Sequence, residues 1–206
     1  DSRICLIVEH QRNGKPSAIN NILKVMSGDV LVLFSGDVRP ADAHFVEDLV
    51  SYCANSAGVV GCRPVPVNDT RTTVGYIGWL MWNLHDRTLI AQLANGLYKQ
   101  AGEAFAIRKE ATVEVPMNVI NDDAYLVLTA QLKGARFAYA REVTVRNRTP
   151  ETMRDMLLQR ARVIRGHRQL KQVFGISPNV LDSLIFRRPF IVAKVLIDEI
   201  RKQIAE

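Results

Sequence analysis

The sequence predicts an α/β protein with a mainly parallel central sheet flanked by helices. Short apolar runs of strand length alternate along the chain with longer segments whose apolar residues repeat at helical spacing. The 206 residues are 48% hydrophobic and 23% charged, which is enough apolar material for a core of ordinary domain size. Three cysteines without a CxxC pair and four widely spaced histidines argue against a disulfide scaffold and a zinc ribbon.

The first half of the chain contains three strand patterns, each followed by a helix pattern. The run at 30–34 is fully apolar and rich in β-branched residues, which is typical of a strand buried on both faces. The helix before it ends at a Ser-Gly pair, and Pro40 is expected to open the next one. The expected elements are a strand at 3–9, a helix at 15–26, a strand at 30–34, a helix at 40–55, a strand at 59–62 and a helix through Trp79, Trp82 and Leu89.

The second half continues the alternation and ends in a basic amphipathic helix. The expected elements are strands at 104–107 and 111–115, a helix at 122–133 that stops at Gly134, a strand at 137–145, and a helix that starts at 149–151 and runs past Arg168. On this last helix, one stripe of side chains is expected to be buried: Met153, Leu157, Ala161 and Ile164.

The positive charge is concentrated in one segment. The whole chain has a net charge of +6, whereas 136–171 alone holds ten Lys or Arg against three Asp or Glu, a net +7. Such a cluster attracts phosphates on a nucleotide, an anionic lipid or a nucleic acid, although a solvated helix face is an equally simple interpretation. A nucleic-acid binder is disfavoured, because only Phe137 and Tyr139 could stack on bases in this segment.

No membrane-spanning segment is expected. The longest uncharged apolar stretch, 74–82, is too short to cross a bilayer, and no basic-then-apolar leader opens the sequence. The sequence therefore predicts a cytoplasmic protein, with attachment to the inner face of the membrane as the alternative.

Asp37 is a candidate metal ligand. It follows the most apolar predicted strand, and ligands of open α/β sheets bind where the strands end. A carboxylate after Gly36 could hold a divalent cation on a diphosphate. The alternative is a capping aspartate in an ordinary turn.

Two further sets of residues suggest acid–base and anion chemistry. Asp122 and Asp123 stand at a helix start, where adjacent like charges raise one pKa and so favour a general base, although helix capping explains one of them. Gln159 and Arg162 are three residues apart on the basic helix, with Gly166 one turn further, an arrangement suited to clamping a diphosphate.

Five segments in this order resemble the inverting glycosyltransferases of family two, which have the A-type nucleotide-diphospho-sugar transferase (GT-A) fold. The similarity covers residues 3 to about 170. The segments are Gly14-Lys15 through Asn20, Phe34-Ser35-Gly36-Asp37, Gly102 through Arg108, Asp122-Asp123, and Gln159 through Val163.

The resemblance implies a single displacement at the anomeric carbon of a nucleotide-sugar donor by a glycan or lipid acceptor. Asp123 would remove the proton of the acceptor hydroxyl, and Asp37 would hold Mg or Mn on the departing diphosphate. The resemblance further implies two groups of binding residues: Lys15, Asn20, Gln159 and Arg162 for the donor diphosphate, and Gly102, Glu103 and Asp122 on the acceptor side. Asp37 and Asp123 are expected to face one crevice with Arg162 nearby.

The sequence also departs from the family pattern. Ser35 replaces the first aspartate of the metal motif, so Asp37 is its only carboxylate and metal dependence is expected to be partial. Val163 replaces a tryptophan, and Asp122 replaces a glutamate. Residues 1–175 are expected to form a catalytic domain that lacks its first nucleotide-binding strands, with a further segment or a partner subunit covering the exposed sheet edge, and 176–206 a helical extension.

Two alternatives remain open. A non-catalytic family member acting as a binding or scaffold subunit would explain the altered metal motif. The C-terminal helix could lie on a membrane surface, since Phe186, Phe190, Ile191 and Val195 alternate with basic residues, or it could dock on the domain.

Overall fold

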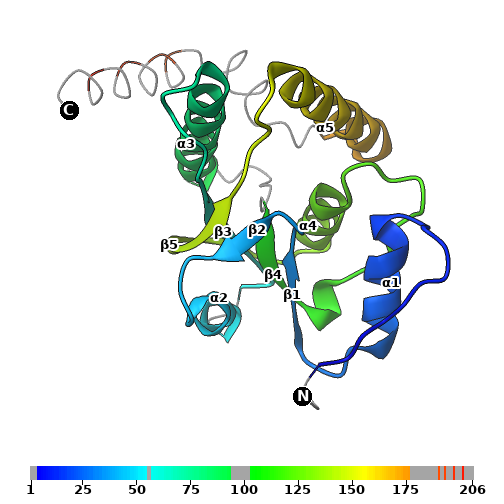
Figure 1. Cartoon of the computed structure of the whole chain (residues 1–206). Coiled ribbons are helices and arrows are strands. Elements are labelled where there is room, and N and C mark those ends of the chain that lie inside the picture. The colour runs from blue at the N-terminus through cyan, green and yellow to red at the C-terminus, as the bar shows by residue number, and fades with distance from the viewer. Residues whose placement is uncertain are drawn as a thin grey trace.

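The computed structural model describes residues 4–54, 57–93 and 103–176, and the isolated positions 190, 193, 197 and 201. Figure 1 shows helices around one central sheet. The elements are α1 (Lys15–Val25), β1 (Val30–Phe34), β2 (Val38–Pro40), α2 (Phe45–Ala54), β3 (Val59–Pro66), α3 (Thr73–Leu93), β4 (Ala104–Arg108), the 3-10 turn Lys109–Ala111, α4 (Asp122–Leu132), β5 (Phe137–Asn147) and α5 (Met153–Phe174). The expected C-terminal interfacial helix lies, apart from the isolated positions, outside the described residues.

The α/β class and the flanking helices are confirmed, and the sheet is mixed. Its strand order is β1-β4-β3-β5-β2. Strands β3 and β5 run parallel, whereas β1–β4, β3–β4 and β2–β5 are antiparallel. A mainly parallel sheet was expected because buried strands of either direction read as continuous apolar runs, so the sequence pattern does not reveal strand direction.

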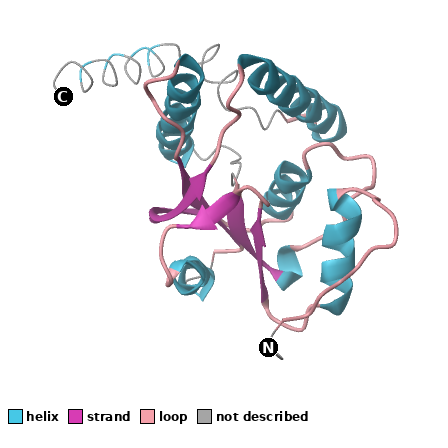
Figure 2. Cartoon of the chain, in the orientation of Figure 1, coloured by secondary structure: helices cyan, strands magenta, loops and turns pink. Residues whose placement is uncertain are grey.

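The two faces of the sheet carry separate cores, because successive side chains of a strand point to opposite faces. Val59 packs in the cluster that includes Ile19 and Leu126, under α1 and α4. Its neighbour Val60 packs with Phe45 and Leu49 of α2. Figure 2 shows α2 on one side of the sheet and α1 and α4 on the other.

The expected strand at 3–9 is wrong. The segment is extended but joins no ladder among the described strands, and its apolar side chains are exposed, with Leu6 at 82% and Ile4 at 75%. Its end is tied to α1 through Glu9, whose Oε1 accepts hydrogen bonds from Ser17 Oγ (2.6 Å) and Asn21 Nδ2 (2.8 Å). An apolar run indicates only a propensity for extended structure, and a strand forms only where a neighbouring strand is available for pairing.

Two other expected boundaries are corrected. Pro40 ends the short strand β2, and the following helix begins only at Phe45. The expected strand at 111–115 is a 3-10 turn and a loop. Val115 in this loop packs in the core, and its backbone N–H and C=O both bond to the Asn20 amide, each at 2.8 Å.

Helix α5 is present but rotated relative to the expected face. It begins at Met153, capped by Thr152, whose side chain accepts the Asp155 N–H at 3.1 Å. The stripe expected to be buried is exposed, for example Leu157 at 63%. The inward positions are instead Met156, Arg160, Val163, His167 and Leu170. None of the described helices is both long and apolar enough to cross a membrane.

Candidate active site

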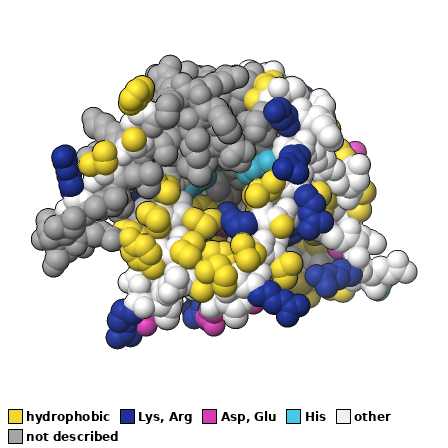
Figure 3. Space-filling model, turned by 90° about the horizontal axis from the view of Figure 1, so that it is seen from above, with side chains coloured by type: hydrophobic (Ala, Val, Ile, Leu, Met, Phe, Trp, Pro, Cys, Tyr) yellow, Lys and Arg dark blue, Asp and Glu magenta, His cyan; other side chains and the backbone are white. Residues whose placement is uncertain are grey.

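Two neighbouring hollows open at one end of the sheet, and Glu103 lines both. Side chains from α1, β1, β4 and α4, or from residues next to these elements, enclose the first hollow: Lys15, Ile19, Leu33, Phe34, Ser35, Glu103, Phe105, Asp122 and Asp123. The second is enclosed by α3, α5, the loop between β5 and α5, and the turn after β1. Its lining is Asp37, Gly78, Met81, Trp82, Glu103, Asn147, Arg148, Thr149, Pro150, Met156, Gln159 and Arg160. Figure 3 shows this end from above, with apolar and basic side chains around a depression.

Glu103 connects the two hollows electrostatically. It precedes β4, and its carbonyl accepts the Ser35 N–H at 3.0 Å, which fixes it beside the end of β1. Burial raises the pKa of Glu103, and the charges of Asp123 and Asp37 raise it further, against a hydrogen bond from Ser35 and the charge of Lys15. Glu103 thus shares one hollow with Asp37 and the other with Asp123.

Asp123 is half-buried in the first turn of α4. Burial raises its pKa; Lys15 opposes the rise, Asp122 adds to it, and backbone N–H groups at the helix start oppose it again. A carboxylate that holds its proton more readily than usual, yet remains reachable from the hollow, is suited to proton transfer.

Lys15 supplies positive charge to the first hollow. The chain turns into α1 at Gly14, whose φ of 86° favours glycine, and this places the Lys15 ammonium 3.2 Å from the Asp122 carboxylate. The Asp122 side chain is 9% exposed and that of Lys15 is 48% exposed. Asp122 therefore pairs with the ammonium group of a side chain that is half exposed to solvent.

Asp37 reaches the same region from the other side. It is exposed in the turn between β1 and β2, which is closed by the Val38 N–H to Ser35 carbonyl bond of 3.3 Å. Asp37 lines the second hollow and Asp123 the first, with Glu103 lining both. That the two aspartates serve one crevice stays a prediction, as do their chemical roles.

The protein side chains here could supply only part of the ligands of a metal ion, so a bound diphosphate and water would have to supply the rest. Among the described residues, no group of three or more His, Cys, Asp or Glu side chains is arranged to hold a metal ion. One exposed carboxylate, Asp37, fits a cation that takes most of its ligands from diphosphate oxygens and water, which is how Mg²⁺ and related ions commonly bind.

Several expected binding residues lie elsewhere or do something else. Asn20 is buried and its amide is engaged by the backbone of Val115, so it holds a loop instead of facing a hollow. Arg162 is an exposed residue of α5. Gly166 leaves no gap: a Cβ there would lie 2.3 Å from Cγ of Asn121, so the glycine permits close packing. Gly102 lies outside the described residues. Gln159 does line the second hollow.

Among the lining residues of the second hollow that the sequence pattern did not single out are Trp82 and Arg160. The sequence pattern identifies Trp82 only as a residue of a helix. It places Arg160 outside the site because it assigns the buried face of α5 to the wrong residues. Choosing Met156, Val163 and Leu170 as the buried stripe would have placed Arg160 inward, since these positions share one helix face.

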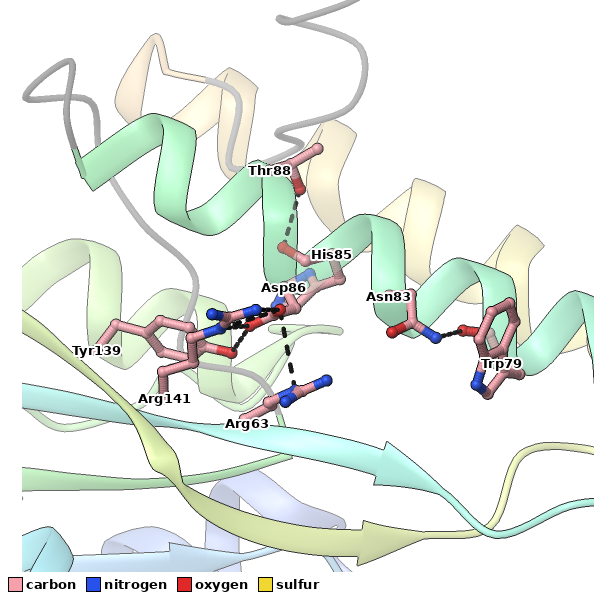
Figure 4. Close-up of polar contacts among 8 residues, drawn as sticks. All are labelled: Arg63, Trp79, Asn83, His85, Asp86, Thr88, Tyr139 and Arg141. Carbon is pink, nitrogen blue, oxygen red and sulfur yellow. Dashed lines mark hydrogen bonds and ion pairs between the residues drawn. The ribbon is translucent and has the colours of Figure 1, made fainter. Parts of the chain in front are cut away.

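A buried ion cluster supports the α3 wall of this hollow (Figure 4). Asp86 of α3 is 3% exposed and accepts hydrogen bonds from Tyr139 Oη (2.7 Å) and Arg141 Nη2 (2.9 Å), while Arg63 Nε lies 3.9 Å away. These partners come from β5 and β3, so the cluster fixes α3 on the sheet. Although burial opposes it, the hydrogen bonds and positive charges lower the pKa of Asp86.

The same helix turn carries a half-buried histidine. The His85 ring packs edge-on against Trp82 at a centroid distance of 5.3 Å, and its Nε2 atom has no hydrogen-bond partner among the described residues. Burial lowers the pKa of His85 to about 4. The ring is therefore neutral at physiological pH and acts as part of the packing behind Trp82.

One family model matches most of the chain. It is described as "Glycosyltransferase like family 2" and matches residues 1–166. No curated protein matches the sequence.

Comparison with solved structures gives one match that shows the fold and two weaker ones. A mannosyltransferase from Pyrobaculum calidifontis, in complex with GDP-Man and Mn²⁺, superposes with a TM-score of 0.61 at 17% identity, covering 98% of this chain and 58% of its own. Mannosyl-3-phosphoglycerate synthase from Rubrobacter xylanophilus gives a TM-score of 0.46 at 17% identity, covering 82% of this chain and 55% of its own. Glucosyl-3-phosphoglycerate synthase from Mycobacterium tuberculosis gives 0.45 at 19%, covering 85% and 57%. The chain thus spans little more than half the length of these proteins.

Proposed function

The chain belongs to glycosyltransferase-like family 2, and from this premise we propose that it moves a sugar from a nucleoside-diphospho-sugar to an acceptor hydroxyl with inversion. The observation that supports the proposal is that two neighbouring hollows, one lined by Lys15 and Asp123 and the other by Asp37, share Glu103. A site of this kind can remove a proton on one side and bind a diphosphate on the other.

In this proposal Asp123 is the general base. The acceptor oxygen attacks the anomeric carbon while its proton passes to the Asp123 carboxylate, and the bond to the diphosphate oxygen breaks. Attack occurs opposite the leaving group, so the configuration inverts. The half-buried position of Asp123 supports this role, because a carboxylate with a raised pKa accepts a proton more readily.

The departing diphosphate needs positive charge. Lys15 is the cation of the first hollow, and Gln159 can donate from the second. A divalent cation such as Mn²⁺ or Mg²⁺, when bound, would supply Lewis-acid stabilisation of the diphosphate. Asp37 is the residue that would hold it, and the Mn²⁺ and GDP-Man of the Pyrobaculum structure support this choice of cofactor and donor class.

The acceptor would enter beside Glu103 and Asp122, with Gly102 nearby in sequence. The acceptor class is a glycan or lipid hydroxyl, and a lipid acceptor would bring the protein to a membrane surface. We assign these steps to a catalytic unit spanning 1–175, with 176–206 as an extension.

A further segment or a partner subunit would cover the exposed apolar chain that precedes α1. Ile4, Leu6 and Val8 expose 67–82% of their surfaces, and solvent-exposed apolar side chains in an extended segment favour pairing with another strand.

The test is donor-dependent stabilisation followed by transfer. Thermal unfolding would be measured with GDP-mannose and UDP-glucose, each with and without Mn²⁺. A ligand that binds only the folded state raises the melting temperature in proportion to the logarithm of its excess over Kd. We expect at least one donor to raise it by several degrees, partly independently of metal because Ser35 replaces a carboxylate. A scaffold subunit without donor binding would show no shift with either donor.

A further inference from the structure

The outer face of helix α5 carries a row of apolar side chains exposed to solvent. Its members follow one another at a spacing of about one helical turn: Met153, Leu157, Ala161 and Ile164. Leu157 exposes 63% of its surface, Ile164 45% and Met153 41%. Figure 1 shows α5 along the outside of the molecule. Because a continuous exposed apolar surface marks an interaction site more often than it marks plain surface, this row calls for an occupant.

The same face is strongly basic. Helix α5 holds six Lys or Arg and one Asp, a net charge of +5, and Asp155 lies at its start. Arg168 and Lys171 continue the apolar row toward the end of the helix. Arg154 and Arg165 lie beside the row, and all four basic side chains are exposed. None of the described carboxylates forms an ion pair with any of the four.

An apolar row accompanied by unpaired basic side chains fits the surface of an anionic bilayer. The apolar side chains of an interfacial helix enter the boundary between headgroups and acyl chains, while long Arg and Lys side chains extend back to the lipid phosphates. The negative surface potential attracts each basic side chain further. A second copy of this chain is disfavoured as the occupant, because two faces of like charge repel each other.

We propose that the outer face of α5 docks on a membrane surface that contains anionic lipids. Leu157 and Ile164 enter the interface, and Arg165 and Arg168 contact lipid phosphates, so that α5 lies along the membrane plane. Gln159, on another side of the same helix, lines the second hollow, and docking therefore brings that hollow next to the membrane. The inference goes beyond sugar transfer and does not depend on it, since a binding or scaffold subunit would dock in the same way.

The test measures binding of the full chain to lipid vesicles by sedimentation, without nucleotide. Vesicles of equal parts phosphatidylcholine and phosphatidylglycerol are compared with vesicles of phosphatidylcholine alone. We expect binding to the anionic vesicles, about tenfold weaker binding to the neutral ones, and a loss of the difference as salt is added.

Matched variants locate the contact. Leu157→Gln should weaken binding to the anionic vesicles about fivefold, because a polar side chain replaces an apolar one in the row. Leu132→Gln, the same change at an exposed position of α4, should leave the affinity unchanged. Arg168→Gln should weaken binding about fivefold at low salt, whereas Arg39→Gln, at an exposed position of β2, should have little effect. All four positions are exposed, so thermal unfolding should match that of the wild type, and Ile164→Gln provides a second variant of the row.

Three results would overturn the proposal. The first is a wild-type protein that does not bind anionic vesicles at low salt. The second is binding that Leu157→Gln, Ile164→Gln and Arg168→Gln leave as strong as the control variants do, which would assign the contact to another surface. The third is a dimer, formed without lipid and dissociated by Leu157→Gln, which would make a second copy the occupant. None of these results bears on the proposed function, which donor binding tests in the absence of lipid.

Discussion

Asp86 and Asp123 are both aspartates on helices that pack against the same sheet, yet their surroundings act on them in opposite directions. Asp86 is enclosed by Tyr139, Arg141 and Arg63, which lower its pKa against the effect of burial. Asp123 lies near Asp122 and Glu103, and burial raises its pKa despite Lys15. The Asp86 carboxylate is fully paired within the fold, whereas the charge of the Asp123 carboxylate is only partly compensated.

The difference indicates which carboxylate supports the structure and which is available for chemistry. A fully paired buried charge stabilises one arrangement and has no capacity for a ligand. A group of carboxylates with raised pKa values is unfavourable for the folded protein alone, and such groups concentrate at functional sites. The same reasoning applies to cations: Arg141 is paired with Asp86, whereas Arg160 has no described carboxylate partner.

The largest expected effect is on transfer. Asp123→Asn removes the proton acceptor but keeps the size of the side chain, so the transfer rate should fall about 100-fold or more while donor affinity changes little. Asp48→Asn, on an exposed position of α2, serves as the control and should be fully active. The measurement is the rate of sugar transfer at saturating donor. Full activity of Asp123→Asn would show that this carboxylate is only a helix cap.

The next effect is on stability. Asp86→Asn leaves Arg141 and Arg63 without their carboxylate, and we expect the free energy of unfolding to fall by about 2 to 3 kcal/mol at neutral pH, the scale of lost charged hydrogen bonds. Because the pKa of Asp86 is lowered in the fold, the stability it provides is present above its unfolded pKa and is lost as the pH falls through its folded pKa. Denaturant titrations should therefore show the difference between wild type and variant shrinking in acid.

Substitution of Glu103 is expected to raise the free energy of unfolding, whereas substitution of Asp86 lowers it. Because the pKa of Glu103 is raised in the fold, its favourable contribution is complete below its unfolded pKa and disappears as the pH rises through its folded pKa. Glu103→Gln removes that loss and should stabilise the protein at neutral pH by about 0.5 to 2 kcal/mol, as is typical when functional strain is relieved. A destabilised Glu103→Gln, assayed by the same denaturant titrations, would place Glu103 with Asp86 among the structural carboxylates.

The smallest effect concerns α5. Arg162→Gln should change the free energy of unfolding by little, because its side chain is exposed and unpaired charges on a helix surface contribute little. Gly166→Ala is the sensitive neighbour, since the added Cβ would clash with Asn121, and it should destabilise the protein by about 1 to 3 kcal/mol. Equal effects of the two changes in chemical denaturation would contradict the rotation of the helix.

The local sequence patterns predict where helices and strands lie better than they predict which strands pair with one another. Strand β1 and helices α1, α3 and α4 follow from apolar spacing and glycine or proline punctuation. The exposed segment before α1 and the antiparallel β4 do not, because pairing depends on strands far away in sequence.

The site was predictable to the same extent. Asp37 and Asp123 stand at a strand end and a helix start, which sequence reasoning locates well, and their proximity to Glu103 follows from the α/β arrangement. Arg160 was missed because α5 carries apolar residues on two faces, so periodicity alone chose the wrong one. Asn20 was misassigned because its engagement with Val115 spans 95 residues of sequence.

The most direct test of the contrast between the two acidic regions is a carboxyl titration by NMR, which follows the side-chain carbons of Asp86, Glu103 and Asp123 as the pH is varied. The account predicts midpoints above the ordinary range for Glu103 and Asp123 and below it for Asp86. An Asp123 midpoint at or below that of Asp86 would contradict it, because the proposed base would then be no better placed to accept a proton than a carboxylate that the fold has fully paired.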